Sequence, residues 1–244
     1  MHFVALATDY DGTLAEDGRV APSTVEALKA LRQSGRRLIL VTGRELPELQ
    51  RVFPEIELCN LVVAENGALL YEPATKTETA LGPAPPAAFL EWLKRHRVSP
   101  LSVGRSIVAT WEPNEKIILQ AIRELGLELQ IIFNKGAVMV LPSGVNKASG
   151  LAAALDRLGL SPLNVVGVGD AENDHAFLRA CGCAVAVANA LPLVKEDAEI
   201  VTSGARGAGV AELIGRLIDD DLAEYAAAAK RRRTSPVIPR PEPG

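Results

Sequence analysis

Short apolar runs alternate with amphipathic stretches along most of the chain. The apolar runs are of strand length and lie at residues 3–8, 37–42, 60–64, 164–168, 183–187 and 199–201. Stretches with helical periodicity lie at residues 23–34, 45–52, 147–158, 172–180 and 207–221. Strands that alternate with helices in this way favour a parallel sheet covered by helices on both faces. The pattern therefore predicts an α/β fold.

The alternation is interrupted between Gly82 and Gly144. Here the pattern predicts a helix at 87–96, a strand at 102–111, a helix at 114–125 and strands at 127–133 and 136–141. Glycine and proline gather at both ends, in Gly82-Pro83-Ala84-Pro85-Pro86 and Pro142-Ser143-Gly144, and such clusters mark boundaries. We therefore expect a Rossmann-like parallel-sheet core from residues 1–82 and 143–222, with a small α+β domain inserted at 83–142.

The end of the chain, residues 223–244, is expected to extend the last helix and then to be disordered. It contains the basic run Lys230-Arg231-Arg232-Arg233, followed by Thr234-Ser235-Pro236 and three more prolines. A basic run this short is typical of a solvated end. We therefore interpret the basic run as a solvated end of the chain and not as a contact with nucleic acid or a membrane.

The composition narrows the class of protein. The 244 residues are 48% hydrophobic and 23% charged, which is ordinary for a globular domain, and a net charge of −4 argues against a nucleic-acid partner. The chain shows no signal peptide and no long apolar span, and its cysteine count is odd, so we expect a cytoplasmic protein without a membrane partner. Cys59, Cys181 and Cys183 lack metal-ligand or redox spacing and are expected to be buried thiols.

Two acids follow the first apolar run. Asp9 and Asp11 lie in Thr8-Asp9-Tyr10-Asp11-Gly12-Thr13-Leu14. Residues i and i+2 of a strand share a side, so both carboxylates should face one site unless the turn begins at Tyr10. Neighbouring acids repel, and burying them is costly without a cation or a shared proton. Taken alone, a solvated Asp-Gly turn is an equally good interpretation.

A second run of strand length also ends in acids. Residues 164–168 lead into Gly169-Asp170, and Asp174 lies one helical turn further on. Function gathers at the carboxyl ends of strands in open α/β sheets, so Asp9, Asp11 and Asp170 should meet at one edge. Three carboxyl groups suit a hard cation such as Mg²⁺, with Asp174 orienting this group or binding as well.

Two smaller signals lie between these units. Thr42-Gly43-Arg44 ends a strand and precedes a helix, whose first N–H groups can meet an anion, and Lys147 opens a later helix. Taken singly, Thr42 is more often an N-cap and Lys147 a solvated surface lysine. Arg44 is equally well interpreted as a residue that binds the substrate phosphate or as one that forms a salt bridge to the helix that follows. Arg105 and Lys135, in the inserted domain, are interpreted as surface charge.

The order of these motifs resembles the haloacid dehalogenase-like phosphohydrolase superfamily across residues 1 to about 220. D-x-D-G-T-L is followed by a strand ending in T-G-R, then by a lysine and then by G-D-x-x-N-D. Glu65-Asn66-Gly67-Ala68, Asn189-Ala190 and Ala198-Glu199-Ile200-Val201-Thr202 resemble its Cof-type and sucrose-phosphatase-like branch. The place of the insert matches the type IIB caps of this superfamily, and its small size is similar to that in phosphoglycolate phosphatases.

The resemblance implies a role for each motif residue. Asp9 would be the nucleophile, and Asp11 the general acid and base, with its backbone carbonyl at the metal. Phosphate binding would fall to Thr42, Gly43, Arg44 and Lys147. The Mg²⁺ site would comprise Asp9, Asp11, Asp170 and Asp174, with Asn173 in support.

The expected function is that of a Mg²⁺-dependent phosphatase that hydrolyses a small phosphorylated metabolite through an aspartyl-phosphate. Phosphoglycolate or a sugar phosphate is the favoured substrate, and the protein is expected to be a monomer or homodimer. One alternative is a phosphomutase similar to the phosphomannomutases of the same superfamily. The other is a non-catalytic ligand-binding domain, against which the intact Asp9, Asp11, Lys147 and Asp170 count. The chain has no G-x-S-x-G, Walker-type or G-x-G-x-x-G motif that would indicate another catalytic centre.

Overall fold

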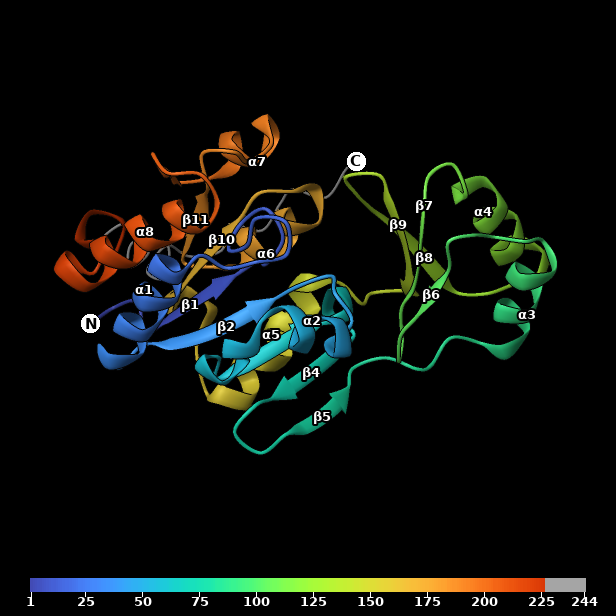
Figure 1. Cartoon of the computed structure of the whole chain (residues 1–244), viewed down its shortest axis with the longest axis horizontal. Coiled ribbons are helices and arrows are strands. Elements are labelled where there is room, and N and C mark those ends of the chain that lie inside the picture. Colours follow the sequence, from blue (N-terminus) through green and yellow to red (C-terminus); the bar gives the residue numbers. More distant parts are fainter. Residues whose placement is uncertain (227–244) are drawn as a thin grey trace, which may run out of the picture.

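The chain forms two lobes, each built on its own sheet (Figure 1). The computed structural model describes residues 1–226, so the part of the tail at 227–244 for which disorder was predicted lies outside the described residues. The large lobe holds an eight-stranded sheet in the order β12-β11-β10-β1-β2-β3-β4-β5. The small lobe holds a four-stranded sheet in the order β6-β7-β9-β8.

The strands of the large sheet are β1 (Ala5–Thr8), β2 (Arg37–Val41), β3 (Leu61–Ala64), β4 (Leu69–Glu72), β5 (Thr77–Ala80), β10 (Val165–Gly169), β11 (Cys183–Ala186) and β12 (Ile200–Val201). The helices of this lobe are α1 (Pro22–Gln33), α2 (Leu46–Val52), α5 (Lys147–Leu158), α6 (His175–Ala180), α7 (Pro192–Asp197) and α8 (Arg206–Asp220). Four short 3₁₀ turns join them: η1 (Pro54–Leu58), η2 (Glu65–Gly67), η3 (Pro162–Asn164) and η4 (Glu172–Asp174).

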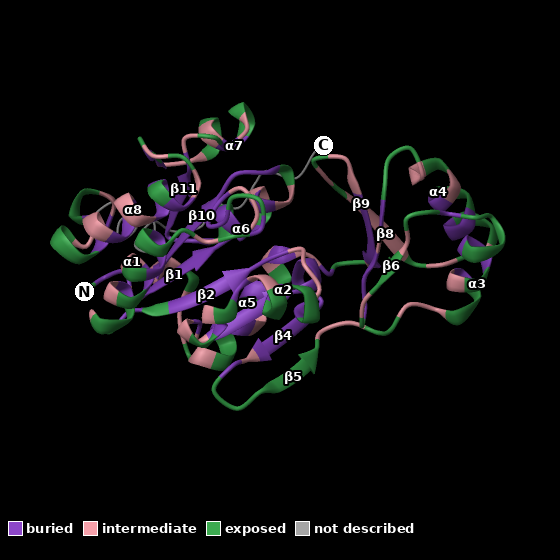
Figure 2. Ribbon diagram, in the orientation of Figure 1, coloured by how far each residue is buried: buried purple, intermediate pink, exposed green. Residues whose placement is uncertain are grey.

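The predicted α/β class with a mostly parallel sheet is confirmed. The strands from β12 to β3 pair in parallel, and the β3–β4 and β4–β5 pairs at one edge are antiparallel. Helix α1 packs against α8 on one face of the sheet, and α5 packs against α6 on the other. The central strands are therefore covered on both faces, and they appear as the buried centre of the large lobe in Figure 2.

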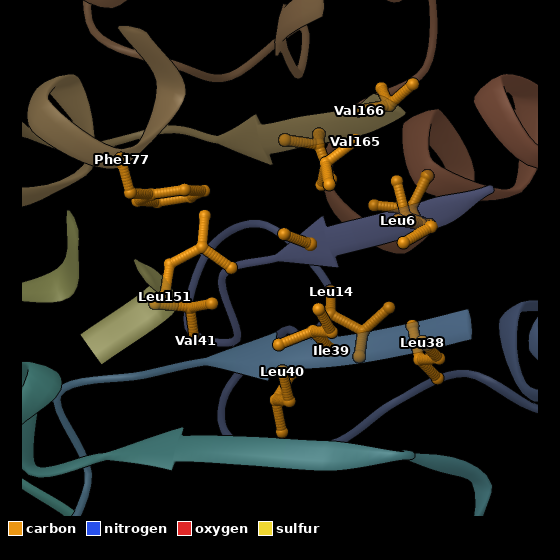
Figure 3. Close-up of a cluster of buried hydrophobic side chains, with 14 of the residues drawn as sticks. Leu6, Leu14, Leu38, Ile39, Leu40, Val41, Leu151, Val165, Val166 and Phe177 are labelled. Carbon is orange, nitrogen blue, oxygen red and sulfur yellow. The ribbon is translucent and has the colours of Figure 1, made fainter. Parts of the chain in front are cut away.

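The core of the large lobe is aliphatic. Leu38, Ile39, Leu40 and Val41 of β2 are all fully buried, and Figure 3 shows them beside side chains from β1, β10, α5 and α6. Strands buried on both faces carry continuous apolar runs instead of alternating ones. This is why β1, β2 and β10 were recognisable from the sequence.

The pattern missed β4, which is buried between β3 and β5, and two elements that bury little. Strand β5 is exposed along its whole length, so its sequence Thr-Glu-Thr-Ala carries no apolar pattern. Helix α7 has six residues and buries only Val194. The predicted strand at 102–111 is divided by a turn in which the Gly104 N–H donates to the Ile107 carbonyl at 2.9 Å. The predicted helix at 172–180 begins as the turn η4 and becomes α-helical at His175.

The small lobe contains two helices on one face of its sheet. Its elements are α3 (Ala87–Arg95), α4 (Glu115–Glu124), β6 (Ser102–Val103), β7 (Val108–Trp111), β8 (Leu129–Asn134) and β9 (Ala137–Pro142). The opposite face of the sheet turns toward the large lobe, where Met139 and Leu141 form one apolar cluster with Ala68. This contact sets the β8–β9 hairpin over the end of the large sheet, and β8 meets η4 there.

The cysteines and the helices were also the subject of predictions from the sequence. Cys59, Cys181 and Cys183 are buried, as predicted, and form no disulfide within the described residues; burial raises the pKa of the Cys59 thiol to about 12. Within residues 1–226, no helix combines the length and the apolar character needed to cross a membrane.

Candidate active site

The site lies where three neighbouring parallel strands end. In the sheet register, Thr8 of β1 lies beside Leu40 of β2 and Val168 of β10. The residues just beyond these strands, Asp9, Thr42 and Asp170, therefore lie at one edge, as was predicted for Asp9 and Asp170. All three are buried. A carboxylate, a hydroxyl and a second carboxylate thus meet in a region shielded from water.

A buried lysine joins two of the acids. Lys147 Nζ donates to Asp9 Oδ1 at 2.5 Å and to Asp174 Oδ1 at 2.6 Å. The side chains of Lys147, Asp9 and Asp174 are 1%, 6% and 0% exposed. The interpretation of Lys147 as a surface lysine is therefore wrong. The lysine is the counter-charge of a buried acidic cluster.

Helix α5 delivers this lysine because its first turn is firmly capped. The Asn146 side chain accepts the N–H groups of Ala148 and Ser149, and the Ser149 side chain accepts the Asn146 N–H, which forms a capping box. The helix also lies close against the sheet, since a Cβ on Gly150 would come within 2.5 Å of Val63. The cap and the close packing place residue 147, the first of the helix, against Asp9.

The ionisation of this pair follows from burial and from the charges around it. Burial tends to lower the pKa of Lys147, but Asp174 and Asp9 outweigh it and hold the pKa above its ordinary value. Burial raises the pKa of Asp9, and Lys147 opposes that rise. Because two carboxylates surround the ammonium, Lys147 stays protonated, and a further cation beside Asp9 would favour its carboxylate.

Asp170 lies on the other side of Asp9 and is also fully buried. Its Oδ1 accepts the Thr13 hydroxyl at 3.0 Å, and its Oδ2 accepts Lys135 Nζ from the small lobe at 2.5 Å. Burial raises the pKa of Asp170, while the hydrogen bond from Lys135 acts to lower it. The neighbouring turn approaches so closely that a Cβ at Gly12, whose φ is +85°, would lie 2.4 Å from Asp170 Oδ2. Glycine is therefore required there.

The acids form one group that fits a hard cation. Asp9, Asp170 and Asp174 each offer a carboxylate oxygen, and these oxygens lie within 4.8 Å of one another. Carboxylate oxygens are the ligands that Mg²⁺ prefers. Asp174 Oδ2 also accepts the N–H groups of Asp170 and Ala171, at 2.8 and 3.0 Å. Asp174 therefore orients the loop that carries Asp170 while it holds Lys147.

Asp11 is placed differently from Asp9. Strand β1 ends at Thr8, and the Tyr10 carbonyl already accepts the N–H groups of Leu14 and Ala15, so the turn has begun at Tyr10. The side chain of Asp11 is 43% exposed, and Arg44 donates to its two oxygens at 2.6 and 2.7 Å. The arrangement of Asp9 and Asp11 as strand residues i and i+2 is therefore wrong.

Arg44 forms the salt bridge to the following helix that was one of its two interpretations, and it also pairs with Asp11. Besides Asp11, its guanidinium contacts Glu48 in the following helix at 2.6 Å, and it lies 5.6 Å from the centre of the Tyr10 ring. The hydrogen bond to Asp11 is the main reason that the pKa of Arg44 is raised. The Tyr10 hydroxyl donates to the Gly18 carbonyl at 3.0 Å.

A strained turn supports the Thr42 loop. Glu65 and Asn66 both have positive φ, +50° and +54°, which non-glycine residues rarely adopt. Their N–H groups donate to the carbonyls of Arg44 and Thr42, each at 2.9 Å. The Thr42 hydroxyl accepts the Arg44 N–H at 3.1 Å. This turn fixes the backbone on which Thr42, Gly43 and Arg44 lie.

The same turn holds the small lobe. The buried Glu65 carboxylate accepts the N–H groups of Arg105, Ser106 and Ile107, at 2.9, 2.8 and 3.2 Å. Asn66 in turn accepts the Asn173 side-chain amide at 2.9 Å, which is the contact that the structure gives to Asn173. Glu65 therefore links the candidate phosphate-binding loop with the turn between β6 and β7.

Three residues that take part in the site were not predicted from the sequence: Thr13, Glu65 and Lys135. Thr13 belongs to the D-G-T motif, and its position next to Gly12 was the available signal. Glu65 lies in the Glu65-Asn66-Gly67-Ala68 motif and carries no catalytic pattern of its own. Lys135 was interpreted as surface charge, which its contact with Asp170 contradicts. Arg105 does form a surface pair, with Glu78 at 2.5 Å, so the same interpretation holds there.

Comparison with known proteins gives the site a context. A family model described as haloacid dehalogenase-like hydrolase matches residues 6–126 and 111–214. A phosphoglycolate phosphatase of Methanothermobacter thermautotrophicus is 32% identical over 230 residues, which cover 88% of this chain and 98% of that protein. Phosphoglycolate phosphatase 2 of Saccharolobus solfataricus is 29% identical, with 90% and 94% covered.

Solved structures share the fold. A haloacid dehalogenase-like hydrolase from Bacteroides thetaiotaomicron superposes with a TM-score of 0.74 at 20% identity, covering 88% of this chain and 99% of that one. A sugar phosphatase of haloacid dehalogenase subclass IIB gives a TM-score of 0.72 at 20% identity, covering 87% and 98%. The resemblance predicted from the order of the motifs is thus confirmed.

Proposed function

Because the chain belongs to the haloacid dehalogenase-like hydrolase family and is a phosphoric monoester hydrolase, we propose that Asp9 is its nucleophile and that phosphoglycolate is its substrate. One observation carries the proposal for the site. The buried Asp9 carboxylate lies 2.5 Å from a buried ammonium and in one group with Asp170 and Asp174. The choice of substrate is supported by relatives of nearly equal length that are named phosphoglycolate phosphatases.

The proposed reaction has two steps. An Asp9 carboxylate oxygen attacks phosphorus, and the bond from phosphorus to the ester oxygen breaks as Asp11 protonates the departing alkoxide. Asp11 then takes a proton from water, whose oxygen attacks the aspartyl-phosphate. Inorganic phosphate leaves, and Asp9 is regenerated. Asp11 suits this exchange because its side chain is partly open to solvent, whereas Asp9 is buried.

Charge compensation around the phosphoryl group is assigned to the neighbouring residues. Lys147 already contacts Asp9 and would meet the phosphoryl oxygens with its third donor position. The Thr42 hydroxyl and the N–H groups of the 42–44 loop would orient the same oxygens. Asp9 and Asp170, with the Asp11 backbone carbonyl, would hold Mg²⁺, and Asp174 would support them. When bound, Mg²⁺ would neutralise charge on the nucleophile and the phosphoryl group.

Arg44 controls the orientation of the proposed acid and base. Its two hydrogen bonds take one acceptor position on each Asp11 oxygen and hold the carboxyl group toward the guanidinium. We assign to Arg44 the positioning of Asp11 before catalysis, and contact with the substrate phosphate once Asp11 is released.

The small lobe is proposed as the cap of the site. It packs over the ends of β1, β2 and β10, and Met139 approaches Gly43 there. A cap in this position would exclude water and contact the part of the substrate beyond the phosphate. The three cysteines form no disulfide within residues 1–226, which fits a reducing compartment, so we propose that the enzyme acts in the cytoplasm.

The test is phosphate release from a panel that contains phosphoglycolate, hexose phosphates and nucleotides, with Mg²⁺ and with a chelator. We expect preferred hydrolysis of phosphoglycolate that the chelator abolishes and added Mg²⁺ restores. Preference for another phosphate ester would overturn the substrate. Hydrolysis that the chelator leaves unchanged would overturn the assignment of the acids to Mg²⁺.

A further inference from the structure

One cation of the small lobe reaches the site from above. Lys135 lies at the tip of the β8–β9 hairpin, where Lys135 and Gly136 have φ of +48° and +85°. Two consecutive positive φ values are typical of a tight two-residue hairpin turn of type I′. The turn therefore presents the lysine to the large lobe in a defined direction.

The ammonium of Lys135 is fixed on one side and open on the other. Its Nζ donates to Asp170 Oδ2, and a Cβ on Gly12 would lie 2.8 Å from it. The Lys135 side chain is nevertheless 45% exposed, whereas that of Asp170 is fully buried. The ammonium therefore lies at the boundary between the buried acids and solvent, with donor positions left beyond its bond to Asp170.

The other cations of the site are engaged more fully in the described part of the chain. Lys147 is buried between Asp9 and Asp174, and Arg44 contacts Asp11 and Glu48. A phosphate ester that also carries a carboxylate brings more negative charge to a site that already holds four acids. Lys135 is an accessible positive charge that the small lobe brings to these acids.

A second polar group lies beside Lys135. The Asn134 side chain is on the face of the small sheet that includes Ile132 and Met139, because Asn134 pairs with Ala137 and Ile132 pairs with Met139. This face packs on the large lobe. The Asn134 Oδ1 atom is buried and has no hydrogen-bond partner within the described residues. This oxygen only accepts hydrogen bonds, so it would take a donor such as water and does not itself contribute to binding a carboxylate.

We propose that Lys135 is the residue that selects a phosphate ester with a carboxylate close to the ester oxygen, by binding that carboxylate with its ammonium. The proposal rests on the proposed hydrolysis of phosphoglycolate by the same site. The hydrogen bond to Asp170 in the large lobe and the hairpin turn of the small lobe together fix the position of the ammonium. Lys135 is expected to increase the affinity for the substrate through its carboxylate, and to leave the rate of the reaction at phosphorus unchanged.

The test compares two substrates in matched variants. Phosphoglycolate carries the carboxylate, and ethyl phosphate is a probe of similar length without it. We expect Lys135→Met to lower kcat/KM for phosphoglycolate by on the order of 10–100-fold, mostly through KM, the range usual for hydrogen bonds to charged groups. For ethyl phosphate the change should stay within about 3-fold. Lys135→Arg should recover most of the loss, since it restores the charge.

A second lysine and a binding measurement provide controls. Lys94 is an exposed lysine on α3, so Lys94→Met makes the same change of charge in the small lobe and should affect neither substrate. In an Asp9→Asn background, calorimetric titration with phosphoglycolate should show weaker binding when Lys135→Met is added.

The outcomes separate this inference from the proposed function. An equal loss on both substrates, or no loss on either, overturns the role of Lys135 while the phosphatase activity stands. Wild-type protein that hydrolyses ethyl phosphate as well as phosphoglycolate likewise overturns the selection of a carboxylate. Wild-type protein that hydrolyses no phosphate ester overturns the proposed function itself.

Discussion

The Lys147 ammonium lies 2.5 Å from the Asp9 carboxylate, and both side chains are almost completely shielded from solvent. An ion pair at this depth stabilises the fold only while both partners and their remaining hydrogen bonds are in place. Asp174 provides the second carboxylate for the ammonium, at 2.6 Å. The proposed nucleophile thus contacts a lysine at the start of α5, the helix that follows the inserted segment 83–142 in the chain.

Removing this lysine should affect both stability and activity. In Lys147→Met, Asp9 and Asp174 lose the cation between them, and we expect the free energy of unfolding to fall by roughly 3–5 kcal/mol. We expect kcat/KM to fall by on the order of 10²–10³-fold, the usual effect of losing one preorganised donor at a developing charge. Denaturant unfolding and kinetics below the transition temperature measure the two effects. Lys116→Met on the exposed part of α4 is the control, and wild-type stability of Lys147→Met would contradict the role of Lys147 as counter-charge.

Replacing the nucleophile should abolish turnover. Asp9→Asn keeps the shape of the side chain, but the amide does not attack phosphorus, so kcat should fall by on the order of 10³-fold or more. Rapid acid quenching with labelled substrate should trap a phosphoenzyme in the wild type and none in the variant. Asp197→Asn, at the end of α7, should trap as much label as the wild type. Label on the Asp9→Asn protein would place the covalent intermediate on another residue.

Glu65 should govern the docking of the small lobe. Glu65→Ala leaves the N–H groups of Arg105, Ser106 and Ile107 without their acceptor, so we expect a loss of roughly 1.5–3 kcal/mol, the usual contribution of hydrogen bonds to a charged group. Hydrogen exchange at these three amides should become faster. Glu78→Gln breaks only the surface pair with Arg105 and should cost less than about 1 kcal/mol. Unchanged protection of the three amides in Glu65→Ala would show that the carboxylate does not hold the turn.

Asp221, which contacts Arg36 and the His2 N–H in the large lobe, should make the free energy of unfolding depend on pH. Partial burial tends to raise its pKa, but the His2 N–H and the Arg36 guanidinium, 2.8 Å away, outweigh burial and hold the pKa below its ordinary value of 3.8. A lowered pKa means that the folded state favours the carboxylate. This stability is present in full above pH 3.8 and is lost as the pH falls through the lowered value.

Asp221→Asn tests this dependence with little change of shape, since asparagine also tolerates the left-handed backbone at this position. We expect the variant to be less stable than the wild type by roughly 1.5–3 kcal/mol at pH 7, with a difference that shrinks steadily below about pH 4. Unfolding curves measured across this range provide the check, with the exposed Asp219→Asn as control. An equal difference at pH 7 and pH 2 would exclude the carboxylate charge as its source.

The sequence was sufficient to predict the central strands and the order of the motifs. Strands β1, β2 and β10 are buried on both faces, so their sequences are continuously apolar and easily recognised. Asp9, Thr42 and Asp170 were predictable as neighbours because each follows such a strand. Elements that bury little, such as β5 and α7, left no comparable pattern.

The fold class, the acids at the strand ends and the family could all be inferred from the sequence. The contacts between charges could not: Lys147 is buried against Asp9, Arg44 holds Asp11, and Lys135 extends from the small lobe to Asp170. Strand and helix patterns record the burial of apolar side chains along one element. Contacts between charged residues far apart in the chain depend on how the lobes pack, which no local pattern records.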